Sequence, residues 1–250
     1  MSKQTILMEK ISSRLVKSLE LSKYGFLEPQ LDLKGLRTQF VRKHVGRSDV
    51  FFINHGIRKY SREEIGFLLH PSYISFDAVN QIFIAIGERI NLEDHLGKVH
   101  PTVVNHPSAS KNAELIQSLA NEIVVIDDSI IEENFLNVTT SIKAYLIDYL
   151  FPFYDKIESL QKINEEIINQ TTQAEVGNYL NGGYAPWIKL IIMKLCKNPG
   201  YDDYKNWLEE TFVRLLPTNP AMYEPKQKIY QELKEFLDSG QYLNLIQNID

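Results

Sequence analysis

LRTQFVRKHVGRSDVFFINHGI, the stretch from Leu36 to Ile57, decides the fold more than any other part of the sequence. Two runs rich in branched and aromatic residues, 36–45 and 50–57, flank the turn-forming segment 46–49. Such runs on either side of a glycine-containing turn are typical of a β-hairpin. A third strand is expected over 64–69, where alternate residues are apolar. The sequence therefore predicts a small antiparallel sheet of about three to four strands.

Helical patterns lie on both sides of this predicted sheet. Residues 4–22 place apolar side chains at helical spacing and predict an N-terminal helix. A helix capped by Ser75 is expected over 75–90, and a strand over 81–86 is the alternative for its most apolar part. From residue 112 onward the pattern is helical to the end, and helices are expected around 142–150, 157–168, 185–197, 202–215 and 225–237. Pro152 is expected to stop the first of these helices, Pro225 to lie in the first turn of the last one, and Gly240 to follow its end.

These patterns predict an α+β fold: an N-terminal helix, a small antiparallel sheet and a mainly helical C-terminal half. One domain over 1–250 is the simplest organisation, and a division is most plausible near 105–112. Residues 91–112 are expected to form a loop that contains a brief strand at 102–105.

Composition narrows the class of protein. The 250 residues are 44% hydrophobic and 24% charged, which is typical of a globular domain with its own core. Cys196 is the single cysteine, so an intramolecular disulfide and a cysteine-rich zinc site are excluded. Charged residues interrupt the first 17 positions, and the most apolar stretch, 187–196, is half the length that a membrane span needs. We therefore expect a cytoplasmic protein with no membrane association.

Charge is divided unevenly along the sequence. Residues 1–62 contain 13 Lys/Arg and 5 Asp/Glu, whereas residues 63–250 contain 14 and 27. One interpretation is that the two parts pack together and neutralise one another. The other is that one of them forms a binding surface for nucleic acid or for a charged protein.

The predicted hairpin is the most basic segment. Phenylalanines at 40, 51 and 52 are interleaved with its cations, and cations together with aromatic rings are what single-stranded nucleic acid requires. The alternative is that these phenylalanines form the core and that the cations protect a sheet edge from aggregation. Residues 34–62 hold eight cations, and the candidates for contact with nucleic acid are Arg37, Arg42, Lys43, Arg47, Arg58 and Lys59, with Lys34 and Arg62 beside them.

All six histidines fall within residues 44–106. Histidine is a common metal ligand and a proton carrier near neutral pH. His44 and His55 flank the predicted turn and can meet on neighbouring strands, while the other four, at 70, 95, 100 and 106, show no spacing of a known metal site. A metal-assisted hydrolase is therefore one alternative function.

Other candidate motifs have ordinary structural explanations. The acids at 127, 128, 132 and 133 lack the spacing of a calcium loop and are interpreted as the start of a helix. Gly182-Gly183 lacks the lysine of a phosphate loop and predicts a turn, and Cys196 is expected to be a buried, unreactive thiol. No nucleophile or nucleotide signature is present, so no cofactor is expected and the balance is against an enzyme.

The order of elements resembles a loose group of uncharacterised bacterial proteins. Three segments carry this resemblance, and together they hold 27 of the 250 residues: Leu36–Phe40, His70–Val79 and Tyr149–Leu160. Some proteins of this group are suspected of binding a toxin as immunity proteins do. The resemblance implies a binding role, and it assigns no functional residue.

The leading hypothesis is therefore a non-catalytic, cytoplasmic binding protein that engages a protein partner through a charged surface, in the manner of an immunity protein or antitoxin. The acidic part of the chain, 63–250, would recognise a basic partner by complementary charge. Nucleic-acid binding through 34–62 and metal-assisted hydrolysis are the two alternatives. The sequence leaves the oligomeric state open.

Overall fold

The computed structural model describes residues 3–27, 29–32, 37–59, 63–91, 101–105, 119 and 121–246. The chain forms two compact units, and it passes between them several times. Unit 1 contains residues 1–44, 48–74 and 105–156, and unit 2 contains residues 45–47, 75–104 and 157–250. A prediction that falls on 92–100 or 106–118 lies outside the described residues.

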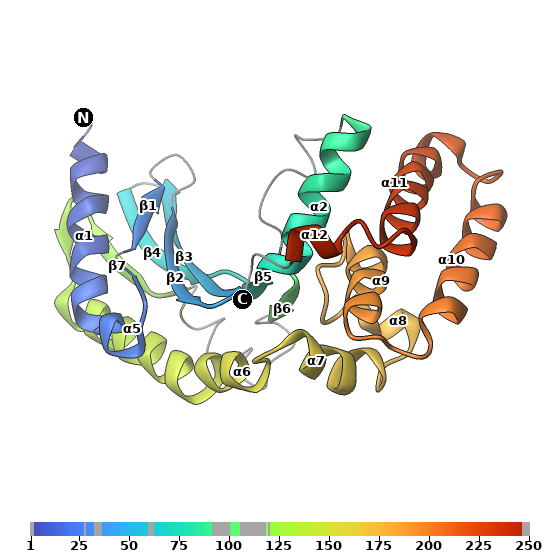
Figure 1. Ribbon diagram of the computed structural model, residues 1–250. Coiled ribbons are helices and arrows are strands. Elements are labelled where there is room, and N and C mark those ends of the chain that lie inside the picture. The colour runs from blue at the N-terminus through green and yellow to red at the C-terminus, as the bar shows by residue number, and fades with distance from the viewer. Residues whose placement is uncertain are drawn as a thin grey trace. The chain divides into compact units, whose positions relative to one another are not determined.

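Within the described residues, one antiparallel sheet has eight strands, twice the number that the sequence predicted. Six strands follow the order β1-β2-β3-β4-β7-β8, while β5 pairs with β3 and β6 (Figure 1). The strands are β1 (Gln30–Asp32), β2 (Arg37–His44), β3 (Arg47–Lys59), β4 (Glu63–Leu69), β5 (Ser72–Phe76), β6 (Val103–Asn105), β7 (Ile123–Ile126) and β8 (Ser129–Ile130).

The predicted hairpin is confirmed as β2 and β3, but its turn is shorter than expected. Only Val45 and Gly46 form it, and Gly46 has the positive φ of 66° that a glycine adopts without strain. The third predicted strand is β4, which pairs with β3 from Ile53↔Leu69 to Lys59↔Glu63. The brief strand expected at 102–105 is β6.

The strands that were not predicted are short. β7 is a run of four branched residues, IVVI, and it lies in a region that was expected to be helical. It forms a two-residue hairpin with β8, in which Ile126 pairs with Ser129. β5 follows directly on β4, and β1 has only three residues. Short runs of this kind carry little periodicity, which explains why the sheet was underestimated.

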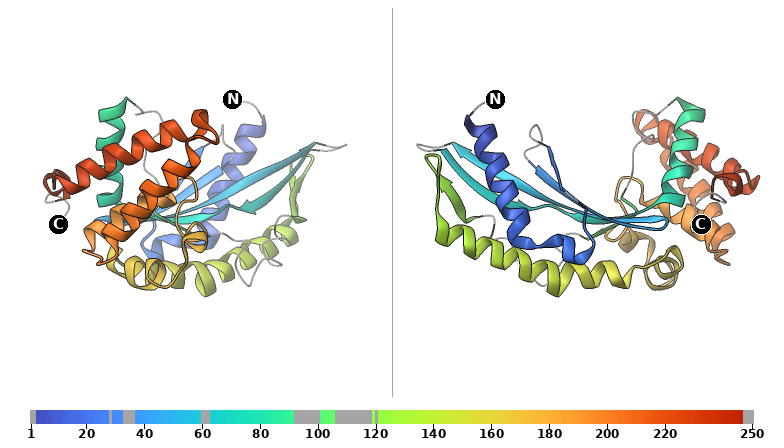
Figure 2. Two further views of the ribbon diagram at one scale, coloured as in Figure 1. Left: turned by 90° about the vertical axis from the view of Figure 1, so that its right-hand side faces the viewer. Right: turned by 60° about the vertical axis from the view of Figure 1, so that its left-hand side comes forward.

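Helices cover the sheet of unit 1. The N-terminal helix is confirmed as α1 (Lys3–Leu19), and a 3₁₀ turn, η1 (Leu21–Tyr24), follows it. The buried side chains of α1 recur at helical spacing and end at Leu19. A long helix runs beside the sheet and contacts both α1 and β7 (Figure 2). It consists of α5 (Glu132–Tyr145), the π-helical turn η3 (Leu146–Leu150) and α6 (Phe151–Lys156).

Pro152 does not stop this helix, contrary to the sequence prediction. In η3 the Phe151 N–H donates to the Leu146 carbonyl oxygen, five residues back. A proline lacks the N–H and crowds the preceding turn, and a π-helical turn directly before it relieves that conflict. The helix therefore continues to Lys156.

Unit 2 is mainly helical (Figure 1). Its elements in addition to β6 are α2 (Asp77–Ile90), α7 (Leu160–Ile163), the π-turn η4 (Asn164–Ile168), α8 (Gln173–Val176), α9 (Ala185–Leu195), α10 (Tyr201–Leu215), α11 (Pro220–Asp238) and α12 (Leu243–Ile246). As expected, α9 is apolar nearly all round, and α2, α7, α10 and α11 pack against it. Helix α12 lies in the region that was expected to be helical, although no separate helix was predicted there.

Two predicted helix starts are wrong by a few residues. Ser75 belongs to β5, where its Oγ accepts a hydrogen bond from Asn80, so α2 begins only at Asp77. Residues 81–86 are helical, which excludes the strand alternative. Pro225 lies inside α11, because Pro220 occupies the first turn and the side chain of Asn219 accepts the Met222 N–H. Gly240 follows the end of α11 with a φ of 75°, as predicted.

Candidate functional site

The basic hairpin presents fewer cations to solvent than its sequence suggests. Arg37 and Lys43 are exposed near the two ends of β2, and the guanidinium of Arg37 also lies over the ring of Phe52. Arg47 is 6% exposed, and its Nη1 donates to the carbonyl oxygen of Ile157 at 2.7 Å. The backbone of Arg58 and Lys59 belongs to β3, but their side chains lie outside the described residues, as do Lys34 and Arg62.

Arg42 is the centre of an ion network in unit 1. Its Nε donates to the Oδ2 atom of Asp49 at 2.8 Å, and its Nη2 donates to Asp155 at 3.1 Å. Asp49 is completely buried, and the Nε2 atom of His44 lies 2.9 Å from the same Oδ2 atom. The guanidinium also lies over three aromatic rings. A buried carboxylate needs such partners, so Arg42 stabilises the fold rather than offering its charge to a ligand.

Histidines do not gather in one place. His44 is the last residue of β2, whereas His55 lies eight residues into β3, about 26 Å farther along the strand. The expectation that these two residues meet is therefore wrong, because the turn lies next to His44. His70 is exposed, and its ring contacts Phe52 edge-on. His95, His100 and His106 lie outside the described residues, and no group of three metal-ligating side chains occurs within them.

His55 forms a buried polar cluster that the sequence did not reveal. Its Nε2 atom lies 2.9 Å from the Thr38 hydroxyl and 3.1 Å from the Ser12 hydroxyl. All three residues are buried, and the cluster joins α1 to β2 and β3. Burial lowers the pKa of His55 to about 4, so its imidazole is neutral at pH 7. No local pattern could have indicated this site, because its members come from three separate elements.

A serine beside a histidine is also the pair that many hydrolases use as nucleophile and base. Ser12 and Thr38 line a pocket of about 370 Å³ beside α1, which also holds Glu9 and Lys17. However, the Nδ1 atom of His55 has no hydrogen-bond partner in the described part of the chain. A catalytic histidine needs a group there to orient it, so the cluster is better suited to fixing α1 on the sheet.

The acidic segment 127–133 is divided between a turn and a helix. Asp127 and Asp128 form the turn of the β7–β8 hairpin with φ values of 48° and 65°, so the interpretation as one helix start is wrong for them. Positive φ at both positions is what a two-residue hairpin turn requires. Glu132 and Glu133 do begin α5, and the guanidinium of Arg14, hydrogen-bonded to Glu132, lowers the pKa of that carboxyl.

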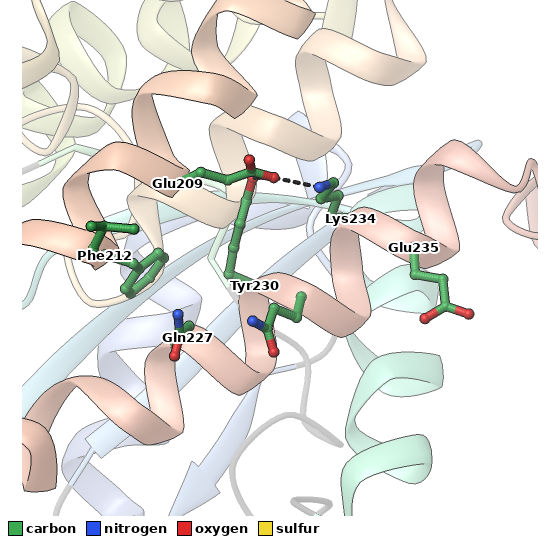
Figure 3. Close-up of a pocket in the computed structure, with 8 residues that line it drawn as sticks. Glu209, Phe212, Gln227, Tyr230, Lys234 and Glu235 are labelled. Atoms are coloured by element: carbon green, nitrogen blue, oxygen red, sulfur yellow. Dashed lines mark hydrogen bonds and ion pairs between the residues drawn. The ribbon is translucent and has the colours of Figure 1, made fainter. Parts of the chain in front are cut away.

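A groove of about 520 Å³ lies along α10 and α11 in unit 2 (Figure 3). The buried rings of Phe212 and Tyr230 form its floor, with their centroids 5.4 Å apart. Val213 lines it with 72% of its surface exposed. The polar residues of its walls are Glu209 and Lys234, which form an ion pair, together with Gln227, Gln231 and Glu235. The Lys234 ammonium lowers the pKa of Glu209.

The charge asymmetry of the sequence becomes a difference between the two units. Unit 1 contains 15 Lys/Arg and 15 Asp/Glu and is neutral, whereas unit 2 contains 12 and 17 and therefore carries the whole net charge of −5. Three ion pairs in unit 1 link the N-terminal part to oppositely charged residues later in the chain: Arg14–Glu132, Arg42–Asp155 and Glu20–Lys143. The cations of the N-terminal part are thus balanced in number by acids of the same unit, and the acidic excess of the sequence lies in unit 2.

Two minor candidates keep their structural explanations. Cys196 follows the last turn of α9 and is half-buried rather than buried as predicted; this partial burial raises the pKa of its thiol to about 11, so the thiol is protonated at neutral pH. Gly182 and Gly183 lie in the turn that precedes α9. In the described segments, no helix combines the length and the apolar character that crossing a membrane requires.

The chain matches no protein-family model, and it matches no curated protein. Its function must therefore be argued from its own surfaces.

Proposed function

We propose that the protein is a non-catalytic binding protein that engages a basic protein partner through unit 2. The observation that carries this proposal is the partition of charge: unit 1 is neutral, and unit 2 holds the full net charge of −5. A compact body with a net charge attracts an oppositely charged partner over several ångströms, which accelerates the encounter and disfavours acidic competitors.

The acids of unit 2 are available for such a partner. Asp203 and Glu210 on α10, and Glu224 on α11, are exposed, and none of them forms an ion pair with another described residue. By contrast, Asp202 and Asp238 share Lys205. Unpaired exposed carboxylates contribute to the field outside the protein, whereas paired ones largely cancel it.

The basic hairpin is the less favoured surface for function. Arg42 and Arg47 are committed to internal partners and Arg37 lies over the ring of Phe52, so Arg37 and Lys43 are the exposed cations of the hairpin whose side chains are described. Six residues separate these two, which corresponds to about 20 Å along a strand. A continuous groove for a phosphate backbone needs cations that are closer together than this.

A capture experiment from the native host tests the proposal. The wild type is compared with the variant Asp203→Asn/Glu210→Gln/Glu224→Gln and with the control Asp127→Asn/Asp128→Asn, which removes two exposed acids of unit 1. Each bait is used with and without nuclease, and the eluates are analysed by mass spectrometry and by absorbance at 260 and 280 nm.

The proposal predicts one basic protein in stoichiometric amount, resistant to nuclease, retained by the control and lost from the unit 2 variant. Equal retention by the unit 2 variant would contradict it. Nucleic acid that nuclease removes, with no protein partner, would favour the hairpin instead.

A further inference from the structure

We infer that the groove between α10 and α11 receives a basic amphipathic helix of the partner protein. This inference rests on the proposed function and specifies its contact surface. Val213 lies in this groove beside the aromatic floor, and Glu209, Lys234 and Glu235 line its walls (Figure 3).

The apolar surface that the groove leaves exposed is that of Val213 at its mouth. Phe212 and Tyr230 are buried by their own helices, but Val213 is 72% exposed at the mouth. An isolated exposed valine needs no explanation, whereas one that borders an aromatic-floored groove of about 520 Å³ offers a place for an apolar side chain. Burial of such a side chain contributes to binding by the same hydrophobic effect that stabilises a core.

The charges along the groove select a basic occupant. Glu209 is compensated by Lys234, but Glu235 is exposed and forms no ion pair with a described residue. Farther along the same two helices, Lys205 contacts both Asp202 and Asp238, and Lys194 also contacts Asp238, so these two acids are compensated. The exposed acids Asp203, Glu210 and Glu224, which form no ion pair with a described residue, lie on the same two helices. A lysine or arginine at the Glu235 end of an inserted segment would therefore meet an uncompensated acid, while an aspartate or glutamate would be repelled there.

The walls of the groove favour a helix over an extended strand. Gln227, Gln231 and Glu235 succeed one another along α11 at helical spacing, and the peptide groups of both walls are bonded within their own helices. An extended segment gains its affinity from unpaired backbone groups at a sheet edge, which these walls lack. An amphipathic helix instead uses apolar side chains at positions i, i+3 or i+4, and i+7, and these match a groove between two helices.

A second groove provides the internal comparison. It lies between α1 and α5 in unit 1, has about 550 Å³, and includes Leu136, which is 65% exposed. The ion pair Arg14–Glu132 joins its walls, Lys143 of its lining pairs with Glu20 just after α1, and its unit carries no net charge. If apolar exposure alone determined binding, the two grooves would be equivalent. If charge selects, only the α10–α11 groove takes a basic helix.

The test uses two synthetic 18-residue helices with leucines at the same helical spacing, one with lysine and one with glutamate at the other positions. Their dissociation constants are measured by calorimetry in 50 mM salt with the wild type, Val213→Arg and Leu136→Arg. The two variants add the same charge at comparably exposed positions, so bulk charge is matched. Both positions are exposed enough to leave folding intact, which thermal melting verifies.

We expect the lysine helix to bind the wild type at least tenfold more tightly than the glutamate helix. Val213→Arg should weaken it at least tenfold, and Leu136→Arg should change it less than twofold. A loss with Leu136→Arg and not with Val213→Arg would overturn the inference while leaving a basic partner in place. Equal binding of the two helices would also overturn it, and the capture experiment, whose variant leaves the groove residues intact, would still decide the proposed function.

Discussion

Replacing Arg42 by alanine tests whether this residue holds unit 1 together. Its side chain is 13% exposed, and the carboxylate of Asp49 that it neutralises is 0% exposed. Removal of one partner of a buried ion pair costs about 3–5 kcal/mol, because the remaining charge stays buried without full compensation. The guanidinium also leaves three aromatic rings, each contributing about 0.5–1 kcal/mol. We therefore expect Arg42→Ala to lower the free energy of unfolding by at least about 3 kcal/mol.

The neighbouring residue provides the control. Lys43 is exposed and adjacent in sequence, so Lys43→Ala should change the free energy of unfolding by less than about 0.5 kcal/mol. Urea unfolding followed by far-ultraviolet circular dichroism measures both. With a slope of about 3 kcal/mol per molar urea, Arg42→Ala should lower the midpoint by about 1 M or more. A shift equal to that of Lys43→Ala would refute the assignment of Arg42 as a buried structural cation.

Three further perturbations follow from individual contacts. The folded protein binds a proton at His55 less readily than the unfolded chain, so the free energy of unfolding should fall by about 3 kcal/mol as the pH drops from 6.5 to 4. Urea unfolding at a series of pH values measures this dependence, and His55→Gln should make it weaker. A Cβ at Gly66 would lie 2.8 Å from the backbone oxygen of Glu122, whereas a Cβ at Gly183 would have open space around it. Gly66→Ala should therefore lower the free energy of unfolding by about 1–3 kcal/mol and lower the melting temperature with it, while Gly183→Ala should change neither. Lys189 is 4% exposed, and its ammonium donates a hydrogen bond to Gln173. Lys189→Met should leave the free energy of unfolding unchanged or raise it by about 1 kcal/mol, because it removes a buried charge. A clear loss of stability would show that the ammonium is needed.

Long periodic elements of the fold could be predicted from the sequence. Helix α1, the β2–β3 hairpin, β4 and the apolar helix α9 all carry their pattern over many residues, and the structure confirms them. Strand β7 could not be distinguished from a helix, because four consecutive branched residues have no period. The prediction that Pro152 ends its helix was wrong for a different reason: a π-helical turn accommodates the proline, and no sequence rule anticipates that turn.

The candidate sites were less predictable than the fold. The basic residues of the hairpin can be read from the sequence, but the sequence could not show that Asp49 and Asp155 lie against Arg42. Likewise, Ser12, Thr38 and His55 are separated by 26 and 17 residues in sequence and meet only in the folded core. The α10–α11 groove depends on how two helices pack, which a single sequence does not specify.

The association rate of the captured partner at two salt concentrations tests the central claim most directly. For the wild type, the account predicts that the rate constant falls at least tenfold between 20 and 300 mM salt, because screening removes the attraction of unit 2. For Asp203→Asn/Glu210→Gln/Glu224→Gln, it predicts a slower and much less salt-dependent association. A rate constant that is the same at both salt concentrations, or the same in wild type and variant, would contradict recognition through the acidic unit.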